Sequence, residues 1–258
     1  MRLSFNLEHF GDCGRALDFY GSVFGNASVK KKTYREMDLA KALGISDLGL
    51  DMIWQSELDI LCGNSTLCME MSDSLLTAMQ KDTASGHFVY HPVICIQHED
   101  EDYARGLFRK IYGNSAGLES LQGGNVVDSH GIQWRYRKDG NQGIAYCLEF
   151  DGFCRDVVSF YERVFGLEAA HVVKYGDSPY GDSVSGPGTD MIYNACLQFE
   201  HHGHMYVLQL SDSYESARKG VNGYNPDALL FYQGLYNPIF TLRDIEGDSL
   251  SGIFDRLM

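Results

Sequence analysis

The sequence predicts an α+β protein built from tandem β-α-β-β-β modules. Three observations lead to this fold class. The second half of the chain repeats the first, the period of hydrophobicity changes from two to about 3.6 and back within each half, and 44% of the 258 residues are apolar. A chain of this length and apolar content buries a sizeable core, which excludes disorder as its main state.

An internal repeat organises the chain. Residues 3–26 align without a gap with residues 144–167 at an offset of 141. A second block, which includes residues 51–53 and 72–74, matches at an offset of 139. The order of elements is therefore the same in both halves, which predicts a first domain at 1–140 and a second at 141–258. The identical pairs include Leu7/Leu148, Gly11/Gly152, Cys13/Cys154, Phe19/Phe160, Tyr20/Tyr161, Asp51/Asp190 and Asp73/Asp212.

Each element of the first module follows from its pattern. Residues 3–8 alternate between apolar and polar side chains, which predicts a strand with one buried face. Apolar residues then recur at helical spacing over 16–24, and Gly25 is placed where a left-handed residue ends a helix. The last two strands are joined by a Gly63-Asn64 turn suited to a hairpin. The three strands after the helix are expected near residues 28–35, 51–61 and 66–71.

A second module begins near Val89, with a strand at 89–96, a helix at 101–112 and strands to about Lys138. In the second half, a strand at 238–242 and a helix at 247–257 match its start, and the remaining strands are missing, so the last module is truncated. An uncovered strand edge pairs readily with another chain, which predicts a homodimer. The alternative is that residues 228–236 fold back over the edge. The tail aromatics expected between the chains are Phe231, Tyr232, Tyr236, Phe240 and Phe254.

Charge and cysteine usage restrict the partners and the compartment. The formal net charge is −14, and the longest basic run is Lys30 to Lys32, so neither nucleic acid nor an anionic membrane surface is an expected partner. The acidic balance suits a cationic ligand. No apolar stretch approaches the roughly 20 residues of a spanning helix, and no signal peptide is expected. Seven cysteines without a C-x-x-C pair indicate free thiols and a cytoplasmic location.

Several motifs resemble the vicinal oxygen chelate superfamily, which includes glyoxalase I, bleomycin-resistance proteins and ring-cleaving dioxygenases. The strongest is Leu17 to Gly25, echoed by Val158 to Gly166. Three further features are similar to the PhnB-like branch. They are the Gly-x-Cys segments at 11–13 and 152–154, the loop Tyr175-Gly176-Asp177-Ser178-Pro179, and the strand end at 208–213. Residues 128–134 resemble the closing strand of the family.

The resemblance implies mixed sheets that curl into a cup around a small-molecule site, with helices on the outer face. It also implies a divalent metal held by His, Gln or Glu on the first and last strands of the modules. The matching positions here hold Phe5, Tyr146, Arg135, Pro92 and Pro238. Phe and Pro cannot ligate a metal, and an arginine repels one. We therefore expect no standard metal centre and no other cofactor.

The function that the resemblance implies is a small-molecule-binding protein of the glyoxalase and bleomycin-resistance kind. Such sites combine apolar walls with a few polar anchors, although an ordinary filled core uses the same aromatic residues. The alternative function is a metal-dependent lyase, isomerase or dioxygenase with displaced ligands, for which His9, Glu70 and His91 are chemically suitable. The candidate ligand-binding residues are Phe5, His9, Trp54, Trp134, Tyr146 and Tyr193.

Two pairs of repeated residues have both a chemical and a structural interpretation. Glu8 and Glu149 suit a general base, or else a structural role facing solvent or a helix, because they alternate out of phase with Phe5 and Leu7, which we expect to face the cup. Cys13 and Cys154 stand at the start of a helix, where the helix dipole favours a nucleophilic thiolate. The structural alternative for both cysteines is a small buried packing residue.

Two polar segments of the second half also have two interpretations. His201-His202-Gly203-His204 suits either an exposed hairpin turn or adventitious binding of Ni or Zn. The glycine-rich segment from Tyr175 to Gly188 suits either a mobile lid over the second cup or an inert surface loop.

Overall fold

The computed structural model describes residues 2–25, 27–38, 40–79, 90–112, 126–138, 143–220 and 240–243. It is a mixed α+β fold that divides into two compact units. The N-terminal unit comprises 3–144 with 238–241, and the C-terminal unit comprises 145–237 with 1–2 and 242–258. The predicted domain boundary between residues 140 and 141 lies outside the described residues and stays a prediction.

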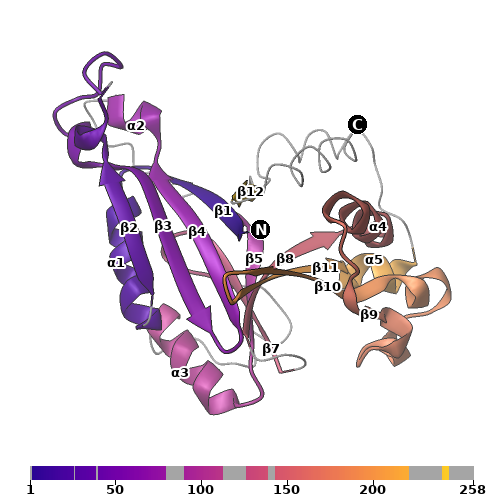
Figure 1. Ribbon diagram of the computed structural model, residues 1–258. Coiled ribbons are helices and arrows are strands. Elements are labelled where there is room, and N and C mark those ends of the chain that lie inside the picture. Colours follow the sequence, from indigo (N-terminus) through magenta and orange to yellow (C-terminus); the bar gives the residue numbers. More distant parts are fainter. Residues whose placement is uncertain are drawn as a thin grey trace. The chain divides into compact units, whose positions relative to one another are not determined.

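The first part of the N-terminal unit is a sheet with the strand order β12-β1-β4-β3-β2. Strand β1 is parallel to β4, whereas β3 is antiparallel to both β4 and β2. Figure 1 shows α1 running alongside this sheet. The elements are β1 (Arg2–His9), α1 (Cys13–Phe24), β2 (Ser28–Thr33), β3 (Ile53–Cys62), β4 (Ser65–Asp73), α2 (Leu75–Met79) and β12 (Phe240–Arg243), with single 3₁₀ turns at Tyr34–Glu36 (η1) and Gly49–Asp51 (η2).

The second part of the N-terminal unit contains strands in the order β6-β7-β5. Strands β5 and β7 are parallel, and β6 is antiparallel to β7. The helix expected at 101–112 is found at those residues. The elements are β5 (Tyr90–Gln97), α3 (Glu101–Tyr112), β6 (Val126–Val127) and β7 (Ile132–Arg137).

The C-terminal unit contains strands in the order β8-β11-β10-β9. Strand β8 is parallel to β11, and β10 is antiparallel to both of its neighbours. The elements are β8 (Gly143–Phe150), α4 (Cys154–Phe165), β9 (Ala170–Lys174), β10 (Ile192–His201), β11 (His204–Asp212) and α5 (Tyr214–Lys219), with 3₁₀ turns at Tyr175–Asp177 (η5), Gly181–Ser183 (η6) and Gly186–Asp190 (η7).

Two predicted chain reversals are confirmed. Helix α1 ends at Gly25, whose φ of 66° is left-handed and whose backbone N–H donates to the carbonyl of Gly21. The Gly63-Asn64 turn connects β3 to β4 and leaves Cys62 paired with Ser65. A two-residue loop fixes the register of the whole hairpin, because each further pair is set by counting outward from the turn.

The predictions for the tail fall outside the described residues. Phe231, Tyr232, Tyr236 and Phe254 are not described, and for Phe240 only its place in β12 is described. The homodimer therefore stays a prediction. Among the described helices, none is long and apolar enough to span a membrane.

In each unit a glycine allows a 3₁₀ turn to approach a short helix very closely. A Cβ at Gly188 would lie 1.8 Å from the carbonyl oxygen of Ala217 in α5. One at Gly49 would lie 2.0 Å from the carbonyl oxygen of Ala78 in α2. Both neighbours are backbone atoms, so a side chain at either glycine forces the turn and the helix apart.

We expect Gly188→Ala to lower the free energy of unfolding by about 1–3 kcal/mol, the usual cost of overpacking. Urea denaturation of the intact chain measures this. The control is Gly21→Ala in α1, where a Cβ meets no other atom within 4 Å. That control should be neutral or stabilising, because alanine favours a helix more than glycine does. Equal stability of Gly188→Ala and the wild type would contradict the close approach.

Candidate functional site

A buried carboxylate at the end of β4 holds the start of α1. Oδ1 of Asp73 accepts hydrogen bonds from the backbone N–H groups of Gly11 and Cys13 at 2.8 and 3.1 Å. Oδ2 accepts one from the backbone N–H of Ile53 at 2.9 Å. The Tyr34 hydroxyl donates to the backbone carbonyl of Asp73 at 2.9 Å. One side chain thus ties β4, β3 and the turn before α1 together.

The same hydrogen bonds recur in the C-terminal unit around Asp212. Its carboxylate accepts from the backbone N–H groups of Gly152, Cys154 and Ile192, each at 2.9 Å. The Tyr175 hydroxyl donates to the backbone carbonyl of Asp212 at 2.9 Å. Burial raises the pKa of Asp212, and the three backbone hydrogen bonds oppose that shift.

Burial and these carboxylates together favour the structural interpretation of Cys13 and Cys154 over the nucleophilic one. The thiols of Cys13 and Cys154 are fully buried. Burial, followed by the nearby carboxylates of Asp73 and Asp212, raises the pKa of both thiols far above the ordinary value. The thiols therefore stay protonated, and their environment suits a packing residue rather than a nucleophile.

The Asp73 contacts also show which face of the N-terminal sheet α1 covers. Residues in register on β1 and β4 project to the same side of the sheet, and His9 is in register with Asp73, as Phe5 is with Met69. Because Asp73 binds the start of α1, the face that carries Phe5, Leu7 and His9 is the helix face. We expected Phe5 and Leu7 to face the open cup, and the structure differs. The buried side chains of α1 pack toward this face.

The opposite side of this sheet, here called the polar face, carries Ser4, Asn6, Glu57 and Glu70. Glu57 is directly opposite Glu70, and Asn6 is in register with Glu70 on its other side. The Ser4 hydroxyl donates to Oε1 of Glu70 at 2.5 Å. Lys30 lies 3.8 Å from the Glu57 carboxylate, and its side chain is 75% exposed, whereas that of Glu57 is 13% exposed. The polar face thus places two carboxylates side by side in a largely enclosed position.

In the C-terminal unit, neutral residues occupy the positions equivalent to this acidic pair. At the offset of 139, Cys196 matches Glu57 and Gln209 matches Glu70, and these two residues are also in register. Gln209 is buried, and its Oε1 accepts a hydrogen bond from the Cys147 thiol at 3.0 Å. The acidic pair is therefore a feature of the N-terminal unit and not of the repeat.

Three of the predicted ligand-binding residues pack against helices or in the interior. Tyr146 is in register with Leu208, on the same face as Asp212, so it lies on the side of its sheet that α4 covers. Trp134 is fully buried, with its ring 5.7 Å from that of Phe24 in α1. Phe5 is also buried on the helix face.

Tyr193 belongs to a small core beneath the 3₁₀ turns of the C-terminal unit. It packs against Tyr175, with the ring centroids 5.4 Å apart, and against Tyr180 at 5.9 Å. Trp54 occupies the equivalent sequence position in the N-terminal unit, at an offset of 139, and its side chain is half-buried. The role of the six predicted residues in ligand binding stays a prediction.

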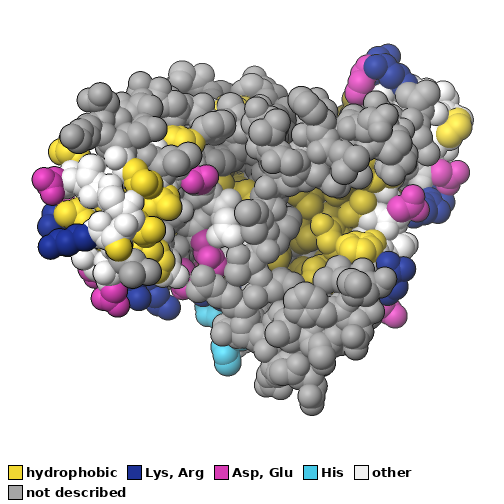
Figure 2. Space-filling view, turned by 90° about the horizontal axis from the view of Figure 1, so that it is seen from above, with side chains coloured by type: hydrophobic (Ala, Val, Ile, Leu, Met, Phe, Trp, Pro, Cys, Tyr) yellow, Lys and Arg dark blue, Asp and Glu magenta, His cyan; other side chains and the backbone are white. Residues whose placement is uncertain are grey.

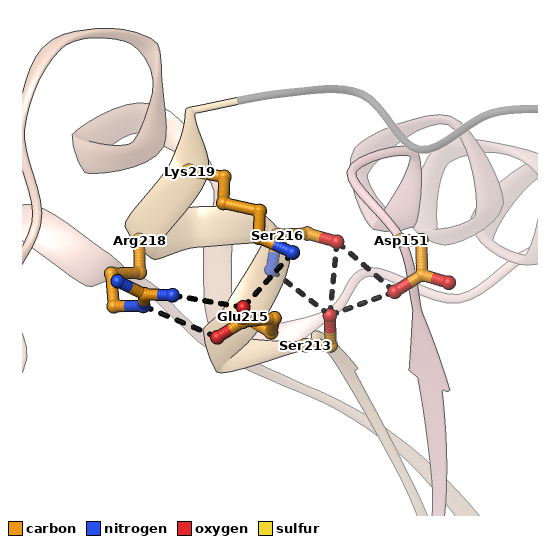
Figure 3. Close-up of polar contacts among 6 residues, drawn as sticks. All are labelled: Asp151, Ser213, Glu215, Ser216, Arg218 and Lys219. Carbon is orange, nitrogen blue, oxygen red and sulfur yellow. Dashed lines mark hydrogen bonds and ion pairs between the residues drawn. The ribbon is translucent and has the colours of Figure 1, made fainter.

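The segment from Tyr175 to Gly188 is anchored at both ends. The backbone N–H of Tyr175 donates to Met191 at 2.9 Å, and Gly188 is held against α5 by the close approach to Ala217. Helix α5 is itself capped by Ser213, whose hydroxyl accepts from the Ser216 backbone. Figure 3 shows Ser213 and Ser216 both reaching Asp151, at 2.7 and 3.0 Å. These contacts indicate a packed surface element rather than a lid.

His9 joins a second group of ionisable side chains at the start of α1. Nδ1 of His9 lies 3.3 Å from one carboxylate oxygen of Asp12, and Nδ1 of His130 lies 3.7 Å from the other. The hydrogen bond with His9 lowers the pKa of Asp12 far below its ordinary value, although burial opposes it. Burial lowers the pKa of His130, and the carboxylates of Asp128 and Asp12 oppose that shift. This group stabilises the turn between β1 and α1.

Asp128 connects this group to Trp134. Its carboxylate accepts from the Tyr20 hydroxyl at 2.5 Å, from Nε1 of Trp134 at 2.8 Å, and from the backbone N–H groups of His130 and Ile132 at 2.8 and 3.0 Å. Tyr20 lies in α1, so the carboxylate joins that helix to β7. The segment from Asp128 to Trp134 therefore has a packing role in the N-terminal unit.

The displaced metal set is not assembled. His9 lies on the helix face and Glu70 on the polar face, and the side chain of His91 is not among those described. Among the described residues, no three His, Cys, Asp or Glu side chains form a group able to hold a metal ion. His201, His202 and His204 lie at the β10–β11 hairpin, with the rings of the first two 4.0 Å apart.

Comparison with known proteins finds no protein-family model that matches the chain and no curated protein that is significantly similar to it.

We expect Asp12→Asn to lower the free energy of unfolding at pH 7 by about 1–2 kcal/mol, because a partly buried charged hydrogen bond is lost. The folded-state pKa of Asp12 is depressed, so its contribution is present above the ordinary carboxyl pKa of about 4 and is lost as the pH falls through the depressed folded value. Denaturation at several pH values measures this.

The matched control is Asp18→Asn, an exposed position on the same helix. It should not change stability at any of these pH values. A stability difference between Asp12→Asn and the wild type that stays constant as the solution becomes acidic would count against the ion pairs of Asp12.

Proposed function

We propose that the protein binds a small organic cation on the polar face of its N-terminal sheet, as a PhnB-like relative of the vicinal oxygen chelate superfamily. The observation that carries the proposal is the register of β3 and β4, which places Glu57 opposite Glu70. Like charges directly opposite each other destabilise a sheet, and partial burial strengthens their repulsion. A cation bound between the two carboxylates relieves that cost.

Two contacts of this pair lie on the polar face itself. The exposed ammonium of Lys30 lies 3.8 Å from Glu57, and an exposed ion pair of this kind contributes little. The Ser4 hydroxyl donates a hydrogen bond to the Glu70 carboxylate. In the view of Figure 2, basic and acidic side chains both occur on the described surface, mainly toward its margins. The net charge of −14 favours the approach of a cation to the whole chain.

The finer statement about the fold is also part of the proposal. We propose two tandem copies of the β-α-β-β-β module with curled sheets and outer helices. The support is the matching set of three backbone hydrogen bonds around Asp73 and around Asp212. The cytoplasmic location and the homodimer stay predictions.

We expect Glu57→Gln and Glu70→Gln each to weaken the binding of metal-free bleomycin, used as a cationic organic probe, by about tenfold or 1.4 kcal/mol. Isothermal titration calorimetry of the full chain measures this. Glu215→Gln is the control, because it removes the same charge from an exposed position on α5. Failure of the wild type to bind, or equal affinities for all variants, would contradict the proposed ligand class.

Metal content separates this proposal from a metal-dependent lyase, isomerase or dioxygenase. We expect protein purified without a His tag to contain much less than one Zn, Ni, Fe or Mn per chain by elemental analysis, because His9 and Glu70 project to opposite faces. About one tightly held metal per chain that is lost in Glu70→Ala or His9→Ala would support the alternative function instead.

A further inference from the structure

We infer that a groove between α1, the end of β3 and α3 is a second binding site, which takes a flat aromatic molecule with one acidic group. The groove has a volume of about 340 Å³, which is within the range of small-molecule sites. All of its lining residues belong to the N-terminal unit, and neither Glu57 nor Glu70 is among them. The site is therefore independent of the proposed function.

Apolar side chains line the groove together with the charged residues Asp102 and Lys110, and two of its large apolar side chains are open to solvent. Leu61 and Tyr103 are each 46% exposed. The Tyr103 ring stacks on His98, with the centroids 4.2 Å apart and the planes at 27°. The Phe24 ring stacks on Trp134 at 5.7 Å and 28°. Both aromatic walls are thus held in place before any ligand arrives, which suits a rigid and flat ligand.

Gly106 keeps the groove open. It lies inside α3, where glycine is less favourable than alanine. A Cβ built at this position meets no other atom within 4 Å, so close packing does not explain the glycine. Gly106 also lines the groove, and any longer side chain there projects into free space. The missing side chain is what leaves a hollow on this part of the helix.

Lys110 supplies the positive charge at one end of the groove. Its Nζ donates to the backbone carbonyl of Val23 at 3.4 Å, and an ammonium has three donors, so two remain for an acidic group. Asp102 also lines the groove, eight residues earlier on the same helix. At 1.5 Å per residue that separation is about 12 Å along the axis, beyond the Debye length of about 8 Å at physiological salt. The Asp102 carboxylate therefore repels an acidic group bound at Lys110 only weakly.

The test uses two fluorescent probes of similar shape with the intact chain. 1-Anilinonaphthalene-8-sulfonate carries a negative charge, and N-phenyl-1-naphthylamine is neutral. We expect Gly106→Leu to weaken the binding of both probes by at least about tenfold, because leucine fills the groove. Lys110→Gln should weaken only the anionic probe, by about three- to tenfold. Arg109→Gln removes the same charge from an exposed neighbour that does not line the groove, and should change neither affinity.

We expect the Gly106→Leu protein to fold, because leucine favours a helix more than glycine does. Its melting temperature should equal or exceed that of the wild type. Unchanged binding of both probes by a folded Gly106→Leu protein would overturn the inference, as would a wild type that binds neither probe. Equal losses in Arg109→Gln and Lys110→Gln would show general charge attraction and would overturn the role of Lys110.

Discussion

The three hydrogen bonds from backbone N–H groups to one buried carboxylate, at Asp73 and again at Asp212, are the interaction on which each unit depends. A helix start leaves N–H groups without partners, and here a side chain from a distant strand supplies the acceptor. The carboxylate fixes where α1 begins and which face of the sheet it covers. The opposite face is left with the polar side chains, so the position of the proposed ligand site is a consequence of this contact.

Much of the local structure could be predicted because it depends on short-range patterns. Gly25 ends α1 and the Gly63-Asn64 turn joins β3 to β4, and both rely on the backbone freedom of glycine and asparagine. That turn also sets the register, so the opposition of Glu57 and Glu70 follows from counting outward along the sequence. The pairing of Glu57 with Glu70 could therefore be predicted from the sequence.

The choice of face was not predictable in the same way. Alternation along residues 3–8 indicates two unlike faces, but it does not tell which one the helix covers. Ser4 is as fully buried as Phe5, so the two faces differ in burial only at the later positions, where Asn6 is half-buried and Glu8 is exposed. The deciding contact joins Asp73 to Gly11 across more than 60 residues, and nothing local to β1 encodes it. For the same reason the aromatic residues were predicted to line a cup, whereas Phe5 and Tyr146 lie on helix faces.

Carboxylates serve two different purposes in this protein, and their donors distinguish them. Asp73, Asp212 and Asp128 are buried, and each accepts at least two backbone N–H bonds besides any side-chain donor. Rigid backbone donors satisfy such a group permanently, so it has little left to offer a ligand. Glu57 and Glu70 instead face each other, with the exposed ammonium of Lys30 and the Ser4 hydroxyl nearby. In the C-terminal unit the backbone-bound carboxylate is kept, whereas the facing pair is replaced by Cys196 and Gln209. Structure thus depends on the first kind of carboxylate, and the proposed cation site uses the second.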